Sequence, residues 1–332
     1  MQKKLNESIT SEIGPIQEKL LFEKSKHIHL NHKDVFVEIG PILGKATKSI
    51  VKGMLLNTKR TSTNKLYVYD SFKYDVNESY AEKILALAKQ QNMLDLIQYK
   101  PNSWICFEKI FNNNLRSYID SEDIIVIKGK KLRHKPPIDC SIAFMRINIS
   151  KRYSDIKSTL FRFLNKTKVS CIIVYDEFFN HWSASIMLTL GFLIYRKCLA
   201  INESTESSII CQIIRTPNDA DLIELDLIMQ DTNECMQFFD IIYDECKRLK
   251  TKVNESSLHT ITLAKIQWLY ERKKHIDAKN ILVNFFNEKH NLSVLRTLIS
   301  PYLDLLGNGF SVDRMHKASK RIVMPKTNTE VL

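Results

Sequence analysis

Near the start of the chain, a carboxylate and two glycines have the types and spacing of a ligand-binding site. Glu38 lies in the apolar run Val-Phe-Val-Glu-Ile, which predicts a buried strand, and Gly40 and Gly44 bracket the turn that follows. Residues 46–56 then predict a helix with Thr47 near its start. A strand, a glycine turn and a helix N-terminus allow the backbone to approach a ligand closely.

A second carboxylate follows the second predicted strand, at residues 65–70, which ends in Asp70. An acid in this position of a nucleotide-type fold commonly binds a ribose diol, because it accepts two hydroxyl hydrogen bonds at once. Glu38 lies before the glycine turn, where its negative charge suits a cationic or amine-bearing ligand.

The glycine spacing restricts the kind of site. The chain has 8 glycines in 332 residues, and three of them, Gly40, Gly44 and Gly53, fall between positions 40 and 53. The spacing Gly-x3-Gly differs from the Gly-x-Gly-x-x-Gly of a dinucleotide fold, and the turn lacks the Lys-Ser/Thr of a P-loop. An ordinary strand-turn-helix connection is the alternative, because the glycines alone do not distinguish the two.

Further along the chain, strands alternate with helices and polar residues follow the strands. Apolar runs at 123–128, 141–147 and 169–175 predict strands with helices between them. This alternation predicts an α/β fold with a mainly parallel sheet and helices on both faces. Ligands of such sheets bind outside the carboxyl ends of the strands. The residues that fall at those ends are Glu38, Gly40, Asp70, Gly129, Asn148, Asp176 and His181.

Two segments carry a resemblance to a known family. Val37-Glu38-Ile39-Gly40 is followed by Gly44 and Thr47, and a later segment reads Val68-Tyr69-Asp70-Ser71-Phe72. This pattern resembles the class I S-adenosylmethionine-dependent methyltransferases, in particular the macrocin O-methyltransferase-like family, with its E-x-G loop and its D-S-F after strand two. The resemblance implies a Rossmann-like methyltransferase sheet, mainly parallel with an antiparallel edge hairpin, and it leaves a C-terminal helical appendage outside.

The same resemblance implies S-adenosylmethionine as the cofactor. In this reading the glycine loop holds the amino-acid end of the cofactor, the acid after strand two binds the ribose, and the next two residues border the adenine. A strand followed by Lys-Gly, here at 128–129, is a further shared element. The implied cofactor-binding residues are Glu38, Gly40, Gly44, Thr47, Asp70, Ser71, Phe72 and Gly129.

The family also binds a divalent metal through an I-D-x-D segment and a D-D pair. This chain has Ile147-Asn148-Ile149-Ser150 and Asp176-Glu177 at the corresponding places. The resemblance therefore implies Asn148, Asp176 and Glu177 as Mg²⁺ ligands with less charge than the family's set, since Mg²⁺ prefers oxygen donors. The alternative is that Asp176-Glu177 is a polar strand end that caps the next helix.

His181-Trp182 matches an H-W pair that often follows the D-D of the family. Histidine is the side chain best able to take a proton near neutral pH, and O-methyl transfer requires a base on the substrate hydroxyl. His181 is therefore the candidate catalytic residue. The alternative is that His181 caps the helix and Trp182 packs beneath it.

The composition is that of a folded protein with 44% hydrophobic residues and a formal net charge of +12. The basic residues are spread along the chain except for a cluster at 314–326, which favours a solvated surface over a nucleic-acid partner. No apolar run has the length of a membrane span, and no apolar signal segment begins the chain. Seven scattered cysteines predict buried free thiols in a reducing, cytoplasmic setting.

The elements divide the chain into four expected parts. Residues 1–30 predict an N-terminal helical cover starting at Gly14-Pro15, and 31–230 form the methyltransferase-like domain. Within it we expect a helix from Pro101 to Tyr118, and a hairpin made of 208–216 and 220–229. Residues 231–310 predict a helical appendage, including a helix at 292–306, and 311–332 a basic tail. Two roles stay open for this appendage, a homo-oligomer contact and a lid.

Two functions of different classes follow from these observations. The first is an S-adenosylmethionine-dependent methyltransferase that acts on an oxygen of a sugar or other small polar metabolite. The second is a non-catalytic, methyltransferase-like binding or scaffold protein, which the incomplete metal-ligand set supports. The intact glycine loop favours the first.

Overall fold

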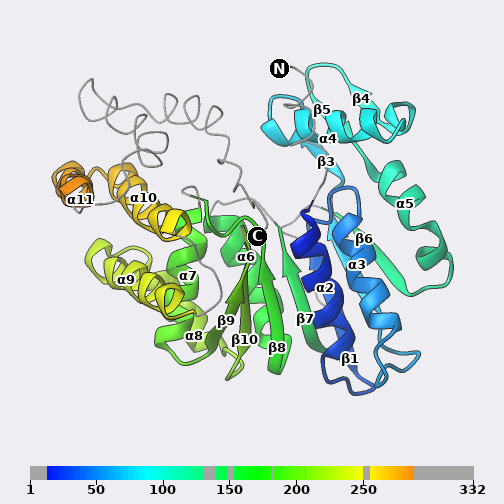
Figure 1. Ribbon diagram of the computed structural model, residues 1–332, viewed down its shortest axis with the longest axis horizontal. Helices are drawn as coiled ribbons and strands as arrows, with labels where there is room; N and C mark the ends of the chain where they lie inside the picture. The colour runs from blue at the N-terminus through cyan, green and yellow to red at the C-terminus, as the bar shows by residue number, and fades with distance from the viewer. Residues whose placement is uncertain are drawn as a thin grey trace, which may run out of the picture. The chain divides into compact units, whose positions relative to one another are not determined.

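The computed structural model describes residues 13–129, 139–148, 153–180, 183–205, 207–249 and 255–287 (Figure 1). The chain divides into two compact units, Met1–Ile261 and Thr262–Leu332, with the boundary inside one helix. The segment boundaries expected at 30, 230 and 310 stay predictions. The fold described below belongs to the first unit.

A seven-stranded sheet forms the centre of the first unit. Its order is β6-β2-β1-β7-β8-β10-β9, and all neighbouring pairs are parallel except those of β10, which runs antiparallel to β8 and β9. The predicted Rossmann-like class, mainly parallel with an antiparallel edge hairpin, is confirmed. The strands are β1 (Asp34–Ile39), β2 (Leu66–Asp70), β6 (Ile124–Lys128), β7 (Ser141–Ile147), β8 (Thr167–Tyr175), β9 (Leu199–Ser204) and β10 (Ile209–Ile213).

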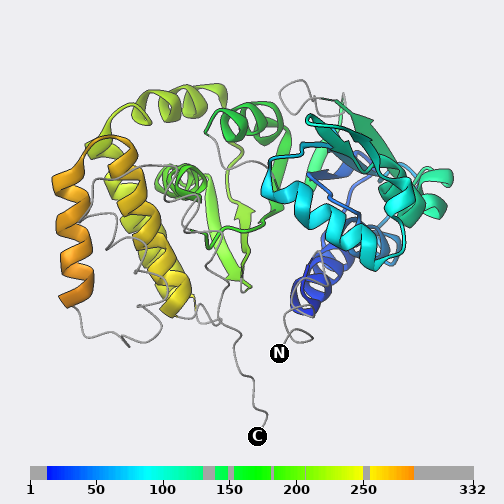
Figure 2. The same ribbon diagram turned by 90° about the horizontal axis from the view of Figure 1, so that it is seen from above.

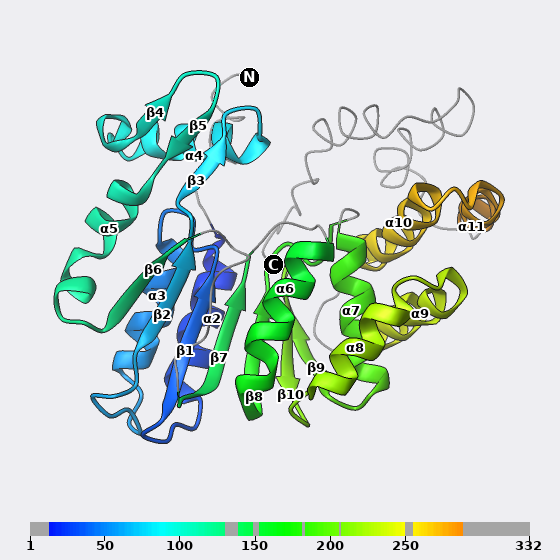
Figure 3. The same cartoon turned by 180° about the vertical axis from the view of Figure 1, so that it is seen from behind.

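Helices cover both faces of this sheet, as Figures 1 and 3 show from opposite sides. The side chains of α2 (Pro15–His27), α3 (Lys45–Leu55) and α5 (Glu108–Asp120) share one buried apolar cluster with inward residues of the strands, such as Phe36 and Phe144. On the other face, α6 (Tyr153–Phe163) packs against β2 through the edge-to-face pair of Phe163 and Tyr69, 5.2 Å apart. Burial on both faces explains the continuous apolar runs of the central strands.

The helix predicted to start at Gly14-Pro15 is confirmed as α2, and it is tightly joined to α3. A Cβ at Gly53 of α3 would lie 2.3 Å from the carbonyl oxygen of Phe22, so glycine is required for this close approach. Asn57, just after α3, donates from Nδ2 to the carbonyl oxygens of Ser25 and Ile28 at 3.2 and 2.7 Å, which satisfies the C-terminal end of α2.

The predicted hairpin of 208–216 and 220–229 is wrong in its second half. The antiparallel edge is formed by β9 and β10, and residues 219–228 form the helix α8 (Asp219–Ile228). The Asn218 side chain accepts the N–H of Asp221, and the Asp221 carboxylate accepts the N–H of Asn218, which is a capping box. The apolar content of this run resembled a strand, but the Asn-x-x-Asp signal at its start specifies a helix.

The helix predicted from Pro101 begins later than expected. A segment inserted between β2 and β6 holds β3 (Lys73–Asp75), α4 (Ser79–Gln90), β4 (Gln98–Lys100) and β5 (Trp104–Cys106), and α5 follows it. The three short strands form a separate antiparallel sheet, β3-β5-β4. In Figures 1 and 2 this cyan and teal segment lies beyond the carboxyl ends of β2 and β6.

After α7 (Ala184–Tyr195) and the edge strands, the elements described up to residue 287 are helices, as predicted. α9 (Thr232–Arg248) packs against α7, and α10 (Glu255–Glu271) contains the boundary between the two units. In the second unit, α11 (His275–Asn287) begins with His275 against the ring of Tyr270, with centroids 4.3 Å apart. The helix predicted at 292–306 and the basic tail lie outside the described residues. No helix among the described residues is long and apolar enough to cross a membrane.

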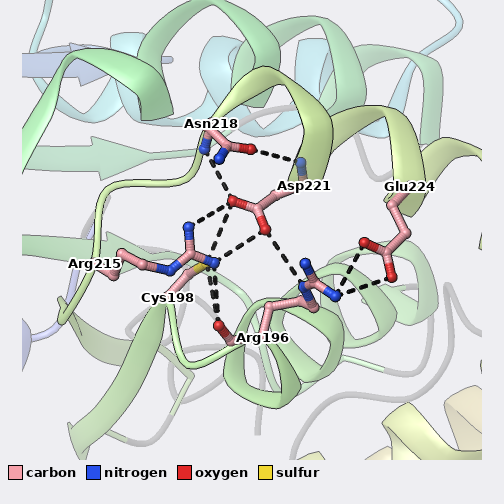
Figure 4. A network of polar contacts seen from close by, with 6 residues as sticks. All are labelled: Arg196, Cys198, Arg215, Asn218, Asp221 and Glu224. Atoms are coloured by element: carbon pink, nitrogen blue, oxygen red, sulfur yellow. Dashed lines mark hydrogen bonds and ion pairs between the residues drawn. The ribbon is translucent and has the colours of Figure 1, made fainter.

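All seven cysteines are free thiols, as predicted, and all but Cys140 are buried. One of them, Cys198, belongs to a polar network that joins the α7–β9 turn to the β10–α8 turn (Figure 4). Arg215 donates from its two terminal nitrogens to the two oxygens of Asp221 at 2.8 and 3.0 Å, and to the sulfur of Cys198 at 2.8 Å. Hydrogen bonds from Arg215 lower the pKa of Asp221 to about 2.

We expect Asp221→Asn to lower the free energy of unfolding at neutral pH by about 1–2 kcal/mol, because it removes charge-assisted bonds at a helix N-terminus. The folded-state pKa of Asp221 is depressed, so its stabilising effect is present above its unfolded pKa and disappears as pH falls toward about 2. Urea denaturation at neutral and acidic pH would measure the difference between wild type and variant. The matched control is Asp219→Asn, an exposed acid in the same first turn. Equal losses of unfolding free energy in the two variants would show that the bonds of Asp221 do not stabilise the fold.

Candidate functional site at the carboxyl edge of the sheet

The carboxyl ends of the parallel strands form a continuous row of polar and glycine residues. The parallel ladder extends one residue beyond the strands: Gly40 donates to the carbonyl of Tyr69, Asn148 to that of Ile39 and Asp176 to that of Ile147, at 2.8–3.1 Å. Gly129 likewise donates to the carbonyl of Asp70 at 2.9 Å. The structure therefore brings five of the predicted site residues to one edge, in the spatial order Gly129, Asp70, Gly40, Asn148, Asp176.

The strand order reverses between β1 and β7, and the two loops at this switch point are in contact. Gly40 has φ +81°, and a Cβ there would lie 1.8 Å from the backbone oxygen of Asn148. Gly44, at φ +96°, is the N-cap of α3, and a Cβ there would lie 2.8 Å from Leu115 of α5. Each glycine of the turn is thus required by conformation and by space. Switch points are where open α/β sheets bind ligands.

Beneath the turn, a buried arginine joins three strands. Arg146 of β7 donates from Nη1 to Glu38 of β1 and from Nη2 to Asp176 after β8. Arg146 and Glu38 are fully buried and Asp176 is 4% exposed. The sequence analysis missed Arg146. Its signal was an arginine inside the apolar run Ser-Ile-Ala-Phe-Met-Arg-Ile, since a charge in a buried strand needs an opposite charge nearby.

Two further side chains extend this ion-pair group to neighbouring elements. Gln17 of α2 donates from Nε2 to Asp176 Oδ1 at 2.6 Å and to the Ser208 hydroxyl at 2.8 Å. Ser208, just before β10, also donates to Asp176 Oδ1 at 3.2 Å. Both carboxylate oxygens of Asp176 are therefore engaged by the protein. The first turn of α2 is fixed over the carboxyl edge, and Lys45 at the start of α3 adds a bond to the carbonyl of Ile13 at 3.1 Å.

Burial raises the pKa of Glu38 above its ordinary value, against the opposing effects of Arg146 and the Thr47 hydroxyl. Glu38 Oε1 receives the bond from Arg146, whereas Glu38 Oε2 and the Thr47 hydroxyl make no hydrogen bond of standard geometry. Both of those atoms are buried, one below the glycine turn and one in the first turn of α3. The Thr47 hydroxyl is close enough to Glu38 to act on its pKa, so these two buried polar groups are neighbours below the glycine turn.

Asp70 lies at the end of β2 and shapes the turn that follows. Its Oδ1 accepts the N–H of Phe72 at 2.6 Å, and the Ser71 hydroxyl lies 3.5 Å from the same oxygen. Phe72 has φ +55°, a left-handed conformation that this bond helps to hold. Asp70 is 2% exposed and Ser71 is half-buried, so the backbone contacts fix the orientation of the carboxylate. Phe72 packs in the core against Phe107 and Phe111.

Glu177 points away from Asp176, toward the inserted segment. It has φ +52°, and its Oε2 accepts the hydroxyl of Tyr80 in α4. Burial, and next the charge of Glu177, raise the pKa of Tyr80 well above its ordinary value, so the phenol stays protonated. The sequence analysis missed Tyr80, because no local pattern links a helix of the insertion to the end of β8.

The structure places Asn148, Asp176 and Glu177 at adjoining strand ends. Among the described residues, no group of three or more His, Cys, Asp or Glu side chains is arranged to hold a metal ion. Asp176 is engaged by Arg146, Gln17 and Ser208. Ile149, Ser150, His181 and Trp182 lie outside the described residues, so the roles predicted for them and for the metal stay predictions.

No protein-family model and no curated protein sequence matches this chain. Solved structures with a similar chain path include the O-methyltransferase NovP, at 16% identity and a TM-score of 0.39 over 60% of this chain and 78% of that one. Cofactor-bound Rv0187 from MTB has 12% identity and a TM-score of 0.40 over 63% and 86% of the two chains. CalS11, a TDP-rhamnose 3′-O-methyltransferase, has 11% identity and a TM-score of 0.40 over 59% and 77%.

Gly40→Ala should destabilise the fold by about 3 kcal/mol or more, because the new Cβ overlaps a backbone oxygen and the φ value disfavours any L side chain. Chemical denaturation with circular dichroism would measure the loss. The matched control is Gly14→Ala, where a Cβ meets no atom within 4 Å and φ is −70°. Similar stabilities for the two variants would show that the turn does not need glycine at position 40.

Glu38→Gln should become more stable relative to wild type as pH rises. The folded-state pKa of Glu38 is raised above 4.5, so the wild-type side chain favours folding below that pH and this effect is lost as pH rises through the folded pKa. The amide has no such pH dependence. Urea denaturation of both proteins from about pH 5 to pH 8 would test this, since groups common to both cancel. A difference in stability that is constant over this range would show that the pKa of Glu38 is not raised.

Proposed function

We propose that this protein is an S-adenosylmethionine-dependent methyltransferase that transfers a methyl group to an oxygen of a sugar or other small polar metabolite. The observation that carries the proposal is the arrangement at the switch point. The glycine turn that follows β1 adjoins the end of β2, which carries Asp70, and Gly40 donates its N–H to the carbonyl of Tyr69. S-adenosylmethionine is a nucleoside that carries an amino acid, so it has both the ribose hydroxyls and the amine that such an edge can bind.

The residues fit the two ends of this cofactor. Gly40 and Gly44 present backbone without side chains at the start of α3, and Glu38 Oε2 and the Thr47 hydroxyl are buried polar atoms beneath it. Asp70 is held in one orientation by the N–H of Phe72, which suits a carboxylate that accepts ribose hydroxyls. Ser71 and Phe72, which follow Asp70, are proposed to border the adenine. Gly129, at the adjacent strand end, donates its N–H to the Asp70 carbonyl.

When bound, S-adenosylmethionine supplies an activated methyl group on a sulfonium. Transfer by in-line displacement depends chiefly on positioning, so the protein must fix both reactants at the edge of the sheet. The buried Arg146 group fixes the ends of β1, β7 and β8 relative to one another. His181, four positions after Glu177 in the sequence, is the proposed base for the substrate hydroxyl.

One observation favours the second function, a methyltransferase-like protein that binds a ligand without transferring a methyl group. Arg146, Gln17 and Ser208 engage Asp176, and Asn148 and Ser150 stand where the resembled family has acids. A protein with this edge could retain cofactor binding and lack metal-assisted chemistry. Binding and its response to magnesium distinguish the two functions.

Calorimetric titration with S-adenosylmethionine and S-adenosylhomocysteine, with and without Mg²⁺, tests the proposal. We expect wild type to bind both with a Kd on the order of micromolar. Asp70→Asn should weaken binding about 10-fold or more, because the amide keeps an acceptor for the N–H of Phe72 but loses the charge that favours two hydroxyl donors. The matched control is Asp75→Asn, an exposed acid in β3. Absence of binding by wild type under both conditions would refute the methyltransferase proposal, and a Mg²⁺ effect would support the metal ligands.

A further inference from the structure

The first part of the insertion, residues 73–84, is weakly buried although it lies beside the carboxyl edge. It comprises β3, the connection to α4 and the first half of α4, and we call it the β3–α4 segment. Of its described side chains between 73 and 83, Ala81 is the one that is buried, Tyr74 and Val76 pack half-buried against the core, and Ile84 is the next buried residue. Segments with few buried apolar contacts open locally at low free energy, so individual polar contacts determine whether such a segment stays closed.

The far end of α4 is anchored to α5. Asn114 donates from Nδ2 to Gln91 at 3.3 Å and to the carbonyl oxygen of Leu43 in the glycine turn at 3.0 Å. Asn113 Nδ2 lies 3.9 Å from the sulfur of Met93. Leu87 and Ala88 in the second half of α4 belong to the buried core. The second half of α4 is therefore anchored to α5 and to the core.

The near end is held to the main sheet by Tyr80. Its hydroxyl donates to Glu177 Oε2 at the end of β8, a contact between positions 97 residues apart in sequence. The ring of Tyr80 stacks on Tyr74 of β3, which in turn stacks on Phe107, with centroids 5.6 and 5.7 Å apart and interplanar angles of 14°. This column of three rings links the entry to α5 with the strand end at Glu177.

The segment leaves the sheet at a turn that Asp70 controls. Asp70 Oδ1 accepts the N–H of Phe72, and the carbonyl of Phe72 accepts the N–H of Phe107 at 3.1 Å. The insertion therefore begins and ends at two residues, Phe72 and Phe107, whose backbones are hydrogen-bonded to each other. Asp70, the residue proposed for the ribose, therefore lies directly at the hinge of the β3–α4 segment.

We propose that the β3–α4 segment is a cover over the carboxyl edge that opens locally, and that the Tyr80–Glu177 hydrogen bond is its latch. The segment begins three residues after Asp70 at the end of β2 and contacts Glu177 at the end of β8 through Tyr80, and in the spatial order of the sheet the ends of β1 and β7 lie between these two strands. A ligand at Gly40 and Asp70 enters and leaves while the latch is open. This last step rests on the proposed function, whereas the latch itself does not.

Hydrogen exchange of the ligand-free protein tests the latch. Tyr80→Phe removes one hydroxyl and keeps the stacked ring, so amides of residues 73–84 should exchange about 10-fold faster, as expected for loss of a hydrogen bond to a carboxylate. Residues 85–90 of α4, which are anchored, should change less. The matched control is Tyr99→Phe in β4 of the same insertion, whose side chain is 58% exposed.

A second variant separates the latch from general weakening of α4. Glu177→Gln should also increase exchange in residues 73–84, and the double variant with Tyr80→Phe should show no further increase, because both changes remove the same bond. Unchanged exchange in both single variants, or increases that add in the double variant, would overturn the latch.

Stopped-flow binding of S-adenosylhomocysteine tests the gating step. Tyr80→Phe should raise the association and dissociation rate constants by a similar factor, up to about 10-fold, with little change in Kd, since it changes access and not the contacts of the bound ligand. A rise in the dissociation rate alone would overturn gating and indicate a direct contact of Tyr80 with the ligand. Absence of binding by wild type would refute the proposed function and the gating step with it, while the exchange data still decide the latch.

Discussion

The pairing of the buried Arg146 with two carboxylates is the interaction on which the geometry of the carboxyl edge depends. The guanidinium joins Glu38 and Asp176, so one side chain connects β1, β7 and β8 where the strand order reverses. Charges this deeply buried are tolerated when each finds its partners, and loss of the cation would leave two unpaired acids in the core. Gln17 and Ser208 complete the set and extend it to α2 and β10.

The two adjacent acids after β8 have different surroundings for a simple backbone reason. Asp176 continues the strand ladder and faces the buried Arg146, whereas Glu177 adopts a left-handed φ of +52° and turns toward α4. Neighbouring residues of one sequence motif thus contact separate parts of the molecule. Asp176 belongs to the sheet, and Glu177 to the boundary between the sheet and the insertion.

The sequence predicts the parts of this structure that depend on local pattern. The strand, glycine turn and helix around Gly40 and the alternation of later strands were enough to predict a parallel sheet and the edge where Asp70, Asn148 and Asp176 meet. Residues 219–228 were misassigned because their apolar content outweighed the Asn218 capping signal. Arg146 and Tyr80 were missed for another reason. Their partners are remote in sequence, and only the folded chain brings them together.

The insertion starts and finishes at Phe72 and Phe107, whose backbones are hydrogen-bonded to each other and whose rings pack 5.7 Å apart. Because its two ends already meet, β2 and the start of α5 are joined at the base of the insertion whatever the length of the chain between them. Selection could therefore lengthen, shorten or replace this segment while the central strands keep their sequence. The part of the molecule nearest the proposed ligand is thus also the part in which related chains can diverge most freely.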